Sequence, residues 1–410
     1  MRRFAWSDLL LLGIFTAMTV QWPMAVGPLS FDLAEPLAIV LLLVYFVITR
    51  PQQVTLTARR RTAFVAATAI VSWAVAVWLV APNWRERRLD LLGWIAPLVL
   101  LAVLLRDRPR SWSHFARLLV LASLPTLAAV FVERALNVGG PFYSPVGAKS
   151  LLGWLGGAHT FPAAGFFGHS NNLASYLLWI IVLTLGLWLG ARGRERLGWT
   201  AMGLALGAAL FFSLARTTII AVAFAGTVLL ALLALRTRGR FVFGVFAGGA
   251  LIALLMIFFF NRLGVDYALS GRPELWERAL RIISRNPASL ATGYLGLRPA
   301  LSEAWYLAHN LFLLGLLMYG VPGALAMITL AVWTVWIGWR DFERLRENTL
   351  AGALWSGMLA FFLVQALVSL DLHEAVPRLT FLSVLIVYLG LLEEAGARQV
   401  GPAGQTSAAG

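Results

Sequence analysis

Long apolar runs follow one another along almost the whole chain and most constrain what it can fold into. Each run has roughly 16–25 residues, enough to cross the hydrocarbon core of a bilayer as an α-helix. None shows the alternation of apolar and polar residues that is typical of a barrel strand. With 60% apolar and only 13% charged residues, the composition does not fit a soluble globular protein. The sequence therefore predicts an all-α polytopic membrane protein.

Twelve transmembrane helices are predicted. We place them at about 7–26, 33–49, 63–81, 90–105, 116–136, 173–191, 199–215, 218–235, 241–260, 308–337, 349–369 and 379–393. They form a single transmembrane domain over residues 1–395, without a separable soluble domain. The small-residue segment that follows, 396–410, is expected to be a disordered cytoplasmic tail.

The basic residues predict the orientation of these helices. With a cytoplasmic N-terminus, 20 of the 33 Lys and Arg residues face the cytoplasm and 13 face the outer side. Cytoplasmic loops of membrane proteins carry the excess of Lys and Arg, so both termini are expected in the cytoplasm. The charges lie in short clusters between apolar runs. We therefore read the net charge of +14 as an orientation signal and a contact with anionic membrane lipids, and expect no nucleic-acid partner.

The outer side holds the longest polar segments, which are the periplasmic loops 137–172 and 261–308. Within the second loop, 273–286 has apolar residues at helical spacing, and Glu277 precedes Arg281 by one helical turn. Pro273 suits a first helical position, and Pro287 follows the end of the segment. The pattern predicts a short amphipathic helix that lies on the membrane surface.

Three residues at the outer ends of these segments are candidates for a site. Arg216 stands between two spans with almost no polar linker, where a guanidinium needs a partner or water, although snorkelling to the head groups also explains it. Arg272 directly precedes the amphipathic helix, whose N-terminus helps to hold an anion. His309 opens the tenth span, and a lone histidine there is more often structural. All three residues are, however, predicted on the same face of the membrane. There the two arginines match a diphosphate, and the histidine can take a proton from a hydroxyl.

The loop 137–172 ends in a glycine- and aromatic-rich stretch that contains His169, Asn171 and Asn172. These side chains either orient a sugar or phosphate or belong to a re-entrant segment packed within the protein. Asn310, next to His309, is a further candidate for binding a sugar or the acceptor. The histidines lack the spacing of metal ligands, and the chain has no cysteine. We therefore expect neither a metal nor another cofactor.

At these residues the chain resembles the O-antigen ligase and O-antigen polymerase family of bacterial cell-envelope enzymes. Four segments carry the resemblance, namely GHSNNLA at 168–174, SLART at 213–217, SGRPELW at 270–276, and AHNL at 308–311 with Gly320 and Gly323 after it. The chain departs from the family at two places. Leu214 and Ala215 separate the serine from the arginine, and Ser170 stands where proline is common.

The resemblance implies a metal-independent, inverting membrane glycosyltransferase of the GT-C class, with its active site on the periplasmic face of the bacterial inner membrane. The donor would be a glycan linked to undecaprenyl diphosphate. Arg216 and Arg272 would hold the diphosphate, and His309 would orient or deprotonate the acceptor hydroxyl.

The acceptor separates two members of that family. An O-antigen ligase transfers the glycan to lipid A core, and we favour it because the compact outer loops leave one well-defined site. A polymerase would instead use a second lipid-linked glycan. A transporter or flippase for a lipid-linked sugar is the alternative from another class, but charges are nearly absent from the middle of the spans, where a translocation path needs them.

Overall fold

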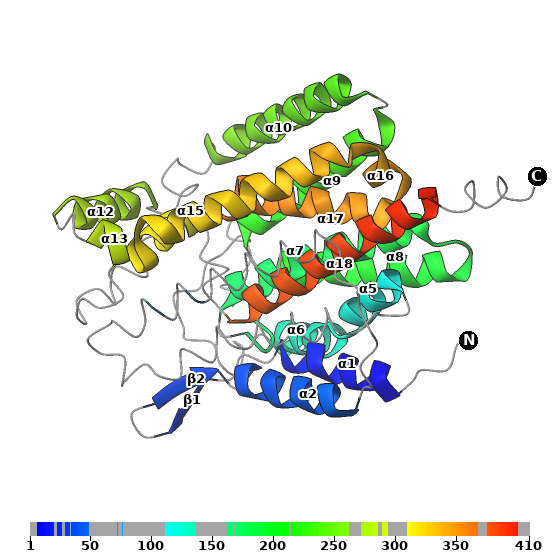
Figure 1. Ribbon diagram of the computed structural model, residues 1–410, viewed down its shortest axis with the longest axis horizontal. Helices are drawn as coiled ribbons and strands as arrows, with labels where there is room; N and C mark the ends of the chain where they lie inside the picture. The colour runs from blue at the N-terminus through cyan, green and yellow to red at the C-terminus, as the bar shows by residue number, and fades with distance from the viewer. Residues whose placement is uncertain are drawn as a thin grey trace, which may run out of the picture.

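The chain is helical throughout most of the part that the structure describes. This computed structural model describes residues 6–19, 23–26, 29–32, 34–48, 72, 76, 111–136, 162–167, 169–213, 215–235, 237–261, 272–285, 289–293, 310–367 and 375–400. The long helices run side by side as a bundle (Figure 1). Their bounds are α1 (Trp6–Ala17), α2 (Ala34–Ile48), α5 (Trp112–Leu121), α6 (Leu124–Leu136), α7 (Ser170–Gly190), α8 (Arg194–Phe212), α9 (Arg216–Ala234), α10 (Arg238–Asn261), α15 (Leu311–Arg340), α17 (Thr349–Ala360) and α18 (Ala375–Val400).

Short elements complete the bundle. They are α12 (Arg272–Arg285), α13 (Ser289–Thr292), α16 (Phe342–Glu347) and the π-helix η4 (Phe361–Gln365). Strands β1 (Pro23–Val26) and β2 (Leu29–Asp32) form an antiparallel hairpin in which Pro23 faces Asp32 and Val26 faces Leu29.

The helices have the length and composition expected of a membrane protein. Among the described residues, four helical stretches are long and apolar enough to cross a bilayer, namely Trp112–Leu136, Ser170–Gly190, Arg216–Ala234 and Tyr319–Arg340. Two shorter apolar helices are Asp8–Ala17 and Thr349–Gln365. The predicted spans at 63–81 and 90–105 lie outside the described residues, apart from helical Ser72 and Ala76. The total of twelve spans therefore stays a prediction.

Two predicted element bounds are wrong. The first span was expected to reach residue 26, but α1 ends at Ala17 and Pro23–Val26 is a strand. Pro23 has no N–H to donate, and it disfavours helical backbone at the preceding residue. The span predicted at 116–136 is confirmed as part of the apolar helical stretch Trp112–Leu136, although a turn at Ala122 and Ser123, where Ser123 Oγ donates to Val120 O at 2.7 Å, interrupts it. In the predicted tail, α18 continues to Val400, and 401–410 lies outside the described residues.

The core lies around α7 and α17, and it depends on close contact between them. A Cβ added to Gly186 of α7 would lie 2.9 Å from Leu350 Cα of α17, and one on Gly357 would lie 2.9 Å from Val182 Cγ1. Small residues at such positions let helix backbones approach in membranes, where van der Waals packing drives association. Aromatic side chains fill the adjoining space, and the rings of Trp179 and Phe361 lie 5.3 Å apart.

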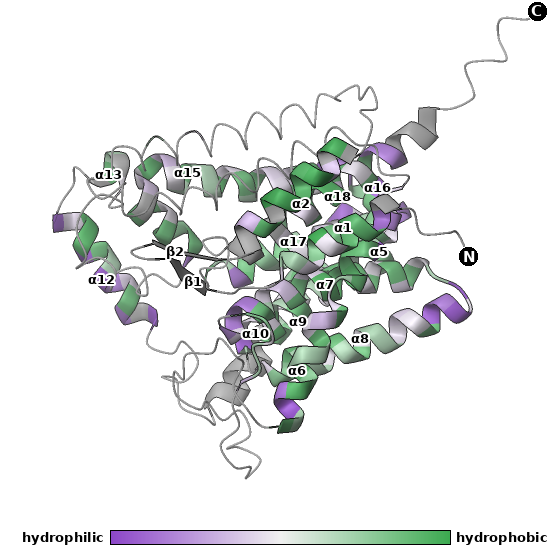
Figure 2. Cartoon of the chain, turned by 90° about the horizontal axis from the view of Figure 1, so that it is seen from below, coloured by the Kyte–Doolittle hydropathy of each residue, from purple (hydrophilic) through white to green (hydrophobic). Residues whose placement is uncertain are grey.

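The helices place two different surfaces at opposite ends of the bundle. The loop end, as we call it, holds the starts of α7, α9, α12 and α15 and the ends of α8 and η4 (Figure 1). The basic end holds the starts of α5, α8 and α10 and all of α16, and the hydrophilic residues of α8 and α16 lie there (Figure 2). The start of α1 and the end of α18 also lie toward the basic end (Figure 1).

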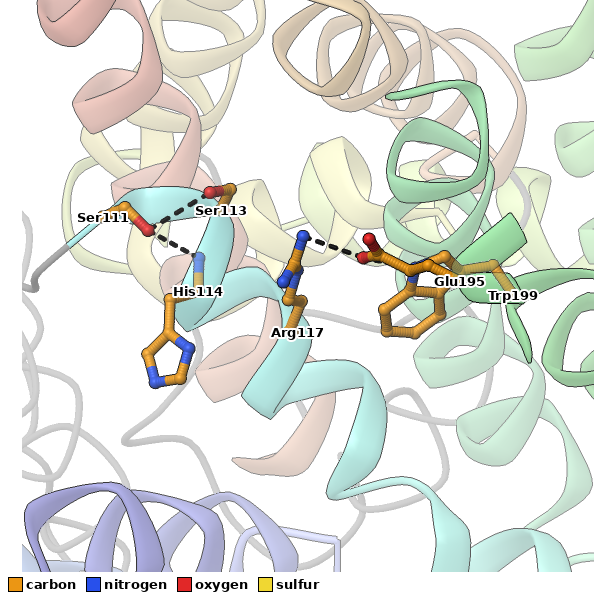
Figure 3. Close-up of polar contacts among 6 residues, drawn as sticks. All are labelled: Ser111, Ser113, His114, Arg117, Glu195 and Trp199. Carbon is orange, nitrogen blue, oxygen red and sulfur yellow. Dashed lines mark hydrogen bonds and ion pairs between the residues drawn. The ribbon is translucent and has the colours of Figure 1, made fainter. Parts of the chain in front are cut away.

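Arginines at the basic end pair with acids and tryptophans. Arg117 Nη2 of α5 lies 2.8 Å from Glu195 Oε1 of α8, and Trp199 Nε1 donates to the same oxygen at 3.2 Å (Figure 3). The start of α5 is capped by Ser111, whose Oγ accepts from the His114 N–H at 3.1 Å (Figure 3). The Arg196 guanidinium lies 4.3 Å from the centre of the Trp188 ring. Tryptophans and basic residues together are typical of a membrane–water boundary.

Candidate functional site

Arg216 lies at the start of α9, directly after a tight turn between two long helices. Helix α8 ends at Phe212, and the Ser213 hydroxyl donates to Leu210 O at 2.6 Å and accepts from the Ala215 N–H at 3.4 Å. Ser213 and Ala215 are buried, and Arg216 is half-buried. The turn therefore fixes Arg216 at the loop end of the bundle, at the position that the sequence predicted.

Helix α12 brings the second predicted arginine to the first turn of α9. Arg272 Nη1 lies 3.5 Å from Thr217 Oγ1, and Arg272 is half-buried. The residue contacted is the one directly after Arg216. Two arginines that are 56 positions apart in the sequence thus come from neighbouring helix N-termini.

The amphipathic character predicted for 273–286 is confirmed by α12. Ala279 and Ile283 are buried on its inner side, and Glu277 Oε1 pairs with Arg281 Nη2 at 3.1 Å on its exposed side. Leu280, which shares the apolar face, is 52% exposed. This exposure leaves part of the apolar face available to lipid, as expected of a helix at a membrane surface.

A kink in α15 makes room for the short helix α13. Gly320 has φ 69° and ψ −164°, a backbone conformation that is essentially restricted to glycine. A Cβ at this position would lie 2.6 Å from Leu290 O and 2.8 Å from the carbonyl carbon of Ala291, both in α13. The described part of the loop 261–308 is therefore packed directly against α15.

Asn310 fixes the first turn of α15. Its Oδ1 accepts from the backbone N–H groups of Phe312 and Leu313, both at 3.0 Å, and its Nδ2 donates to Leu367 O at 3.0 Å. Capping of this kind is a structural role, and it places the residue at the loop end. His309 directly precedes this cap, but it lies outside the described residues. Its proposed part in the chemistry stays a prediction.

His169 caps α7 in the same manner. Its Nδ1 accepts from the Asn171 N–H at 3.0 Å, so Nδ1 carries no proton in this arrangement. Its backbone carbonyl accepts from the Asn172 N–H at 3.1 Å. His169, Asn171 and Asn172 are all half-buried. The first turn of α7 thus places the three candidates at the loop end, where Arg216, Arg272 and Asn310 also lie.

The segment 162–167, just before this cap, is packed between helices. The Ala163 N–H donates to Phe212 O at the end of α8 at 3.0 Å, and Ala163, Ala164 and Phe167 are buried. The Phe167 and Tyr176 rings lie 5.4 Å apart. The stretch 162–167 is therefore packed within the protein, whereas binding of a sugar or phosphate by His169, Asn171 and Asn172 stays a prediction.

Glu133 is a site residue that the sequence analysis missed. It lies in α6, is 5% exposed, and accepts with Oε2 from the N–H groups of Ala164 and Gly165, both at 2.9 Å. Its Oε1 is buried without a hydrogen-bond partner among the described residues. An acidic residue near the end of an apolar span is costly and marks a candidate functional position, and this signal was present in the sequence.

Gln365 was missed as well, and it connects two of the helices that carry candidates. Thr218 Oγ1 donates to Gln365 Oε1 at 3.1 Å, and Gln365 Nε2 donates to Ser175 Oγ at 2.9 Å. All three residues are buried. A glutamine within an apolar run was the available signal, but the sequence does not reveal its partners.

The described loop end thus combines arginine side chains with helix N-termini, of which the one that begins with Arg216 has no side-chain cap, and this combination suits an anionic ligand. Within the described ranges, no three His, Asp or Glu side chains gather as metal ligands would, and the absence of a metal stays a prediction. The chain matches no family model and, at a stringent level of similarity, no curated protein.

Proposed function

We propose that this protein transfers a glycan from undecaprenyl diphosphate to an acceptor hydroxyl at the periplasmic face of the bacterial inner membrane. One observation supports the proposal most directly. Arg272 Nη1 lies 3.5 Å from Thr217 Oγ1, next to Arg216. A diphosphate carries negative charge on two neighbouring phosphoryl groups, and two guanidinium groups from adjacent helix N-termini match that distribution.

The proposed reaction needs charge stabilisation more than acid catalysis. The acceptor hydroxyl oxygen attacks the anomeric carbon, the bond between that carbon and the diphosphate oxygen breaks, and undecaprenyl diphosphate leaves with the electron pair. Arg216 and Arg272 stabilise the charge that develops on the leaving group. His309 orients the hydroxyl or takes its proton. Direct attack inverts the anomeric centre and requires no metal.

The acceptor we propose is lipid A core, which makes the protein an O-antigen ligase. His169, Asn171, Asn172 and Asn310 lie at the loop end and are our candidates for contacts with the sugar or the acceptor. The first turn of α7 and the first turn of α15, which carry these residues, are both capped. These contacts would therefore form with little loss of conformational freedom. A product chain extended by a second lipid-linked glycan would identify a polymerase instead.

The arginines are tested by substitution with lysine in the purified protein, supplied with the lipid-linked glycan and lipid A core. Lysine keeps the charge but loses the planar fork of donors. We expect Arg216→Lys and Arg272→Lys each to lower the transfer rate at least about tenfold, a loss of about 1.4 kcal/mol of transition-state stabilisation. Arg285→Lys is the matched control, because Arg285 is exposed at the far end of α12, and it should transfer glycan normally.

The same assay separates an enzyme from a transporter through His309. A positioned general base contributes on the order of 100- to 10,000-fold to a rate, so His309→Ala should abolish detectable product while binding of the lipid-linked donor is kept. His309→Gln should keep slight activity if orientation outweighs proton removal. Wild-type rates in both Arg→Lys variants would contradict the diphosphate site. A wild-type protein that forms no glycosidic product but moves the donor across a vesicle membrane would be a transporter.

A further inference from the structure

The π-helix η4 places a glutamine in the core of the bundle at the point where α17 ends. The Ala366 N–H donates to Phe361 O, five residues earlier, at 2.7 Å, which is the wider turn that defines a π-helix. Gln365 closes this turn and is 2% exposed. Single π turns inside helices are often found at functional sites, because they redirect side chains at a cost in backbone stability.

The Gln365 side chain holds two helices at once. Its Oε1 accepts from Thr218 of α9 at 3.1 Å, and its Nε2 donates to Ser175 of α7 at 2.9 Å. Thr218 and Ser175 are each 1% exposed. Thr218 lies two residues after Arg216, and Ser175 lies in the second turn of α7, close to the His169 cap.

The next two residues hold a third helix through their backbone. The Leu311 N–H donates to Ala366 O at 2.8 Å, and Asn310 Nδ2 donates to Leu367 O at 3.0 Å. Gln365, Ala366 and Leu367 therefore contact the starts of α7, α9 and α15. These are the helices that carry His169, Arg216 and the segment of His309 and Asn310.

We infer that Gln365 is a positioning residue, which sets where the start of α9, with Arg216, lies relative to the starts of α7 and α15. The inference rests on the proposed function for its catalytic meaning, but the placement itself is a property of the fold. A buried polar group that is left without its partner is unfavourable, so loss of either hydrogen bond favours a shifted helix start. A displacement of about 1 Å at a reacting group can lower a rate on the order of 100-fold.

The placement is measured first without any assay of activity. The chain contains no cysteine, so cysteines at Ala223 of α9 and Leu313 of α15 can carry spin labels in otherwise unchanged protein. We expect Thr218→Val and Gln365→Leu to shift or broaden the distribution of distances between the labels. Thr184→Val is the matched control, because Thr184 is also buried but its hydroxyl donates only to Ile180 O of its own helix, at 2.7 Å.

Catalysis is tested with a double-mutant cycle in the transfer assay. If Thr218 acts through Arg216, Thr218→Val should lower the rate about 10- to 100-fold in the wild-type background, but less than about threefold once Arg216→Lys is present. Thr184→Val should have the same effect in both backgrounds. A general loss of stability would lower the transfer rate by the same factor in both backgrounds. The cycle therefore separates an effect on positioning from an effect on folding.

The two measurements separate failure of this inference from failure of the proposed function. If the distance distribution in Thr218→Val and Gln365→Leu matches that of Thr184→Val, the positioning role is wrong, whatever the activity. Additive effects of Thr218→Val and Arg216→Lys would also overturn it. If the distances change but wild-type protein forms no glycosidic product, positioning by Gln365 stands and the proposed reaction is wrong.

Discussion

At the scale of single residues, Glu133 shows how one acidic side chain can fix the backbone of a neighbouring segment. Its carboxylate accepts from the N–H groups of Ala164 and Gly165, which face the carboxylate because Gly165 adopts a positive φ of 60°. A Cβ on Gly165 would lie 3.2 Å from Val130 Cγ2 of α6, so the close approach of this segment to α6 also depends on the glycine. Together the two residues hold 162–167 in place just before the cap of α7.

Replacement of Glu133 tests this arrangement. Glu133→Ala leaves two buried N–H groups without an acceptor, and each costs about 1–3 kcal/mol. We expect the free energy of unfolding in detergent micelles to fall by on the order of 3 kcal/mol. Glu133→Gln keeps an oxygen acceptor at the same position, so the loss should be clearly smaller.

Glu343→Ala provides the control for that comparison. Glu343 is 63% exposed at the basic end and pairs with Arg346 at 2.7 Å. An exposed ion pair contributes about 0–1 kcal/mol, so this variant should unfold almost like the wild type. Equal losses in Glu133→Ala and Glu343→Ala would show that the 162–167 segment does not depend on the carboxylate.

The residues of the candidate site divide into those that a sequence pattern can find and those that it cannot. Arg216 and Arg272 stand out because charges next to apolar runs are costly, and the structure brings their helix starts together. The partners of Glu133 and Gln365 do not stand out in this way. Gln365 contacts Thr218 and Ser175 across 147 and 190 positions, and no local periodicity specifies contacts over such separations.

At the scale of elements, hydrophobic runs locate helices well but do not locate their breaks. The span predicted at 173–191 corresponds to α7 (Ser170–Gly190), and the one at 33–49 corresponds to α2 (Ala34–Ile48). The hairpin of β1 and β2, the turn at Ala122 and Ser123, and the π-helix η4 were not anticipated. These breaks depend on single prolines, on hydroxyl groups that bond to the backbone, and on contacts with neighbouring helices, whereas the apolar runs continue through them.

Gly320 gives an element-scale prediction, because α15 bends where α13 lies against it. Gly320→Ala would combine a strained backbone conformation with a contact of 2.6 Å to Leu290 O. We expect the free energy of unfolding to fall by on the order of 3 kcal/mol. Proteolysis should also cut more readily near α13, because this helix would lose its packing contact with α15.

Gly207→Ala is the matched control. Gly207 lies in the middle of α8, where an added Cβ meets nothing within 4 Å. Replacement of glycine by alanine in an unobstructed helix stabilises by about 0.5–1 kcal/mol. The two substitutions are therefore expected to change stability in opposite directions. A neutral or stabilising Gly320→Ala would show that the kink is not required.

At the scale of the whole molecule, the two ends of the bundle differ. The basic end carries arginine–acid pairs and tryptophans, and the loop end carries the candidate site. The pairs at the basic end include those of Arg117 with Glu195, Arg344 with Asp341, and Arg346 with Glu343. The segregation agrees with the excess of basic residues that the sequence assigned to the cytoplasmic side. Which ends of the described helices lie together was predictable from charge and run length, since both act over whole segments, whereas their orientation in the membrane stays a prediction.

The orientation is tested with single cysteines at Ser284 and Thr237. Both positions are exposed, the first in α12 at the loop end and the second just before α10 at the basic end. An impermeant thiol reagent added to intact spheroplasts should label Ser284→Cys and spare Thr237→Cys. Permeabilised cells, in which both should react, provide the control. The opposite pattern would place Arg272 in the cytoplasm and exclude a periplasmic site.

The shortness of α1 and α2 has a consequence for the lipid around the protein. Their 12 and 15 residues reach about 18 and 23 Å along the helix axis, whereas the hydrocarbon core of a bilayer is about 30 Å thick. Between them lies the hairpin of β1 and β2, which among the described residues pair only with each other, and open strand edges are not tolerated in contact with lipid tails. In contrast, the stretch Tyr319–Arg340 of α15 has 22 residues and reaches about 33 Å. We therefore expect a bilayer that surrounds the protein to be thinner along α1 and α2 than along α15, so that lipids with short tails collect on one flank.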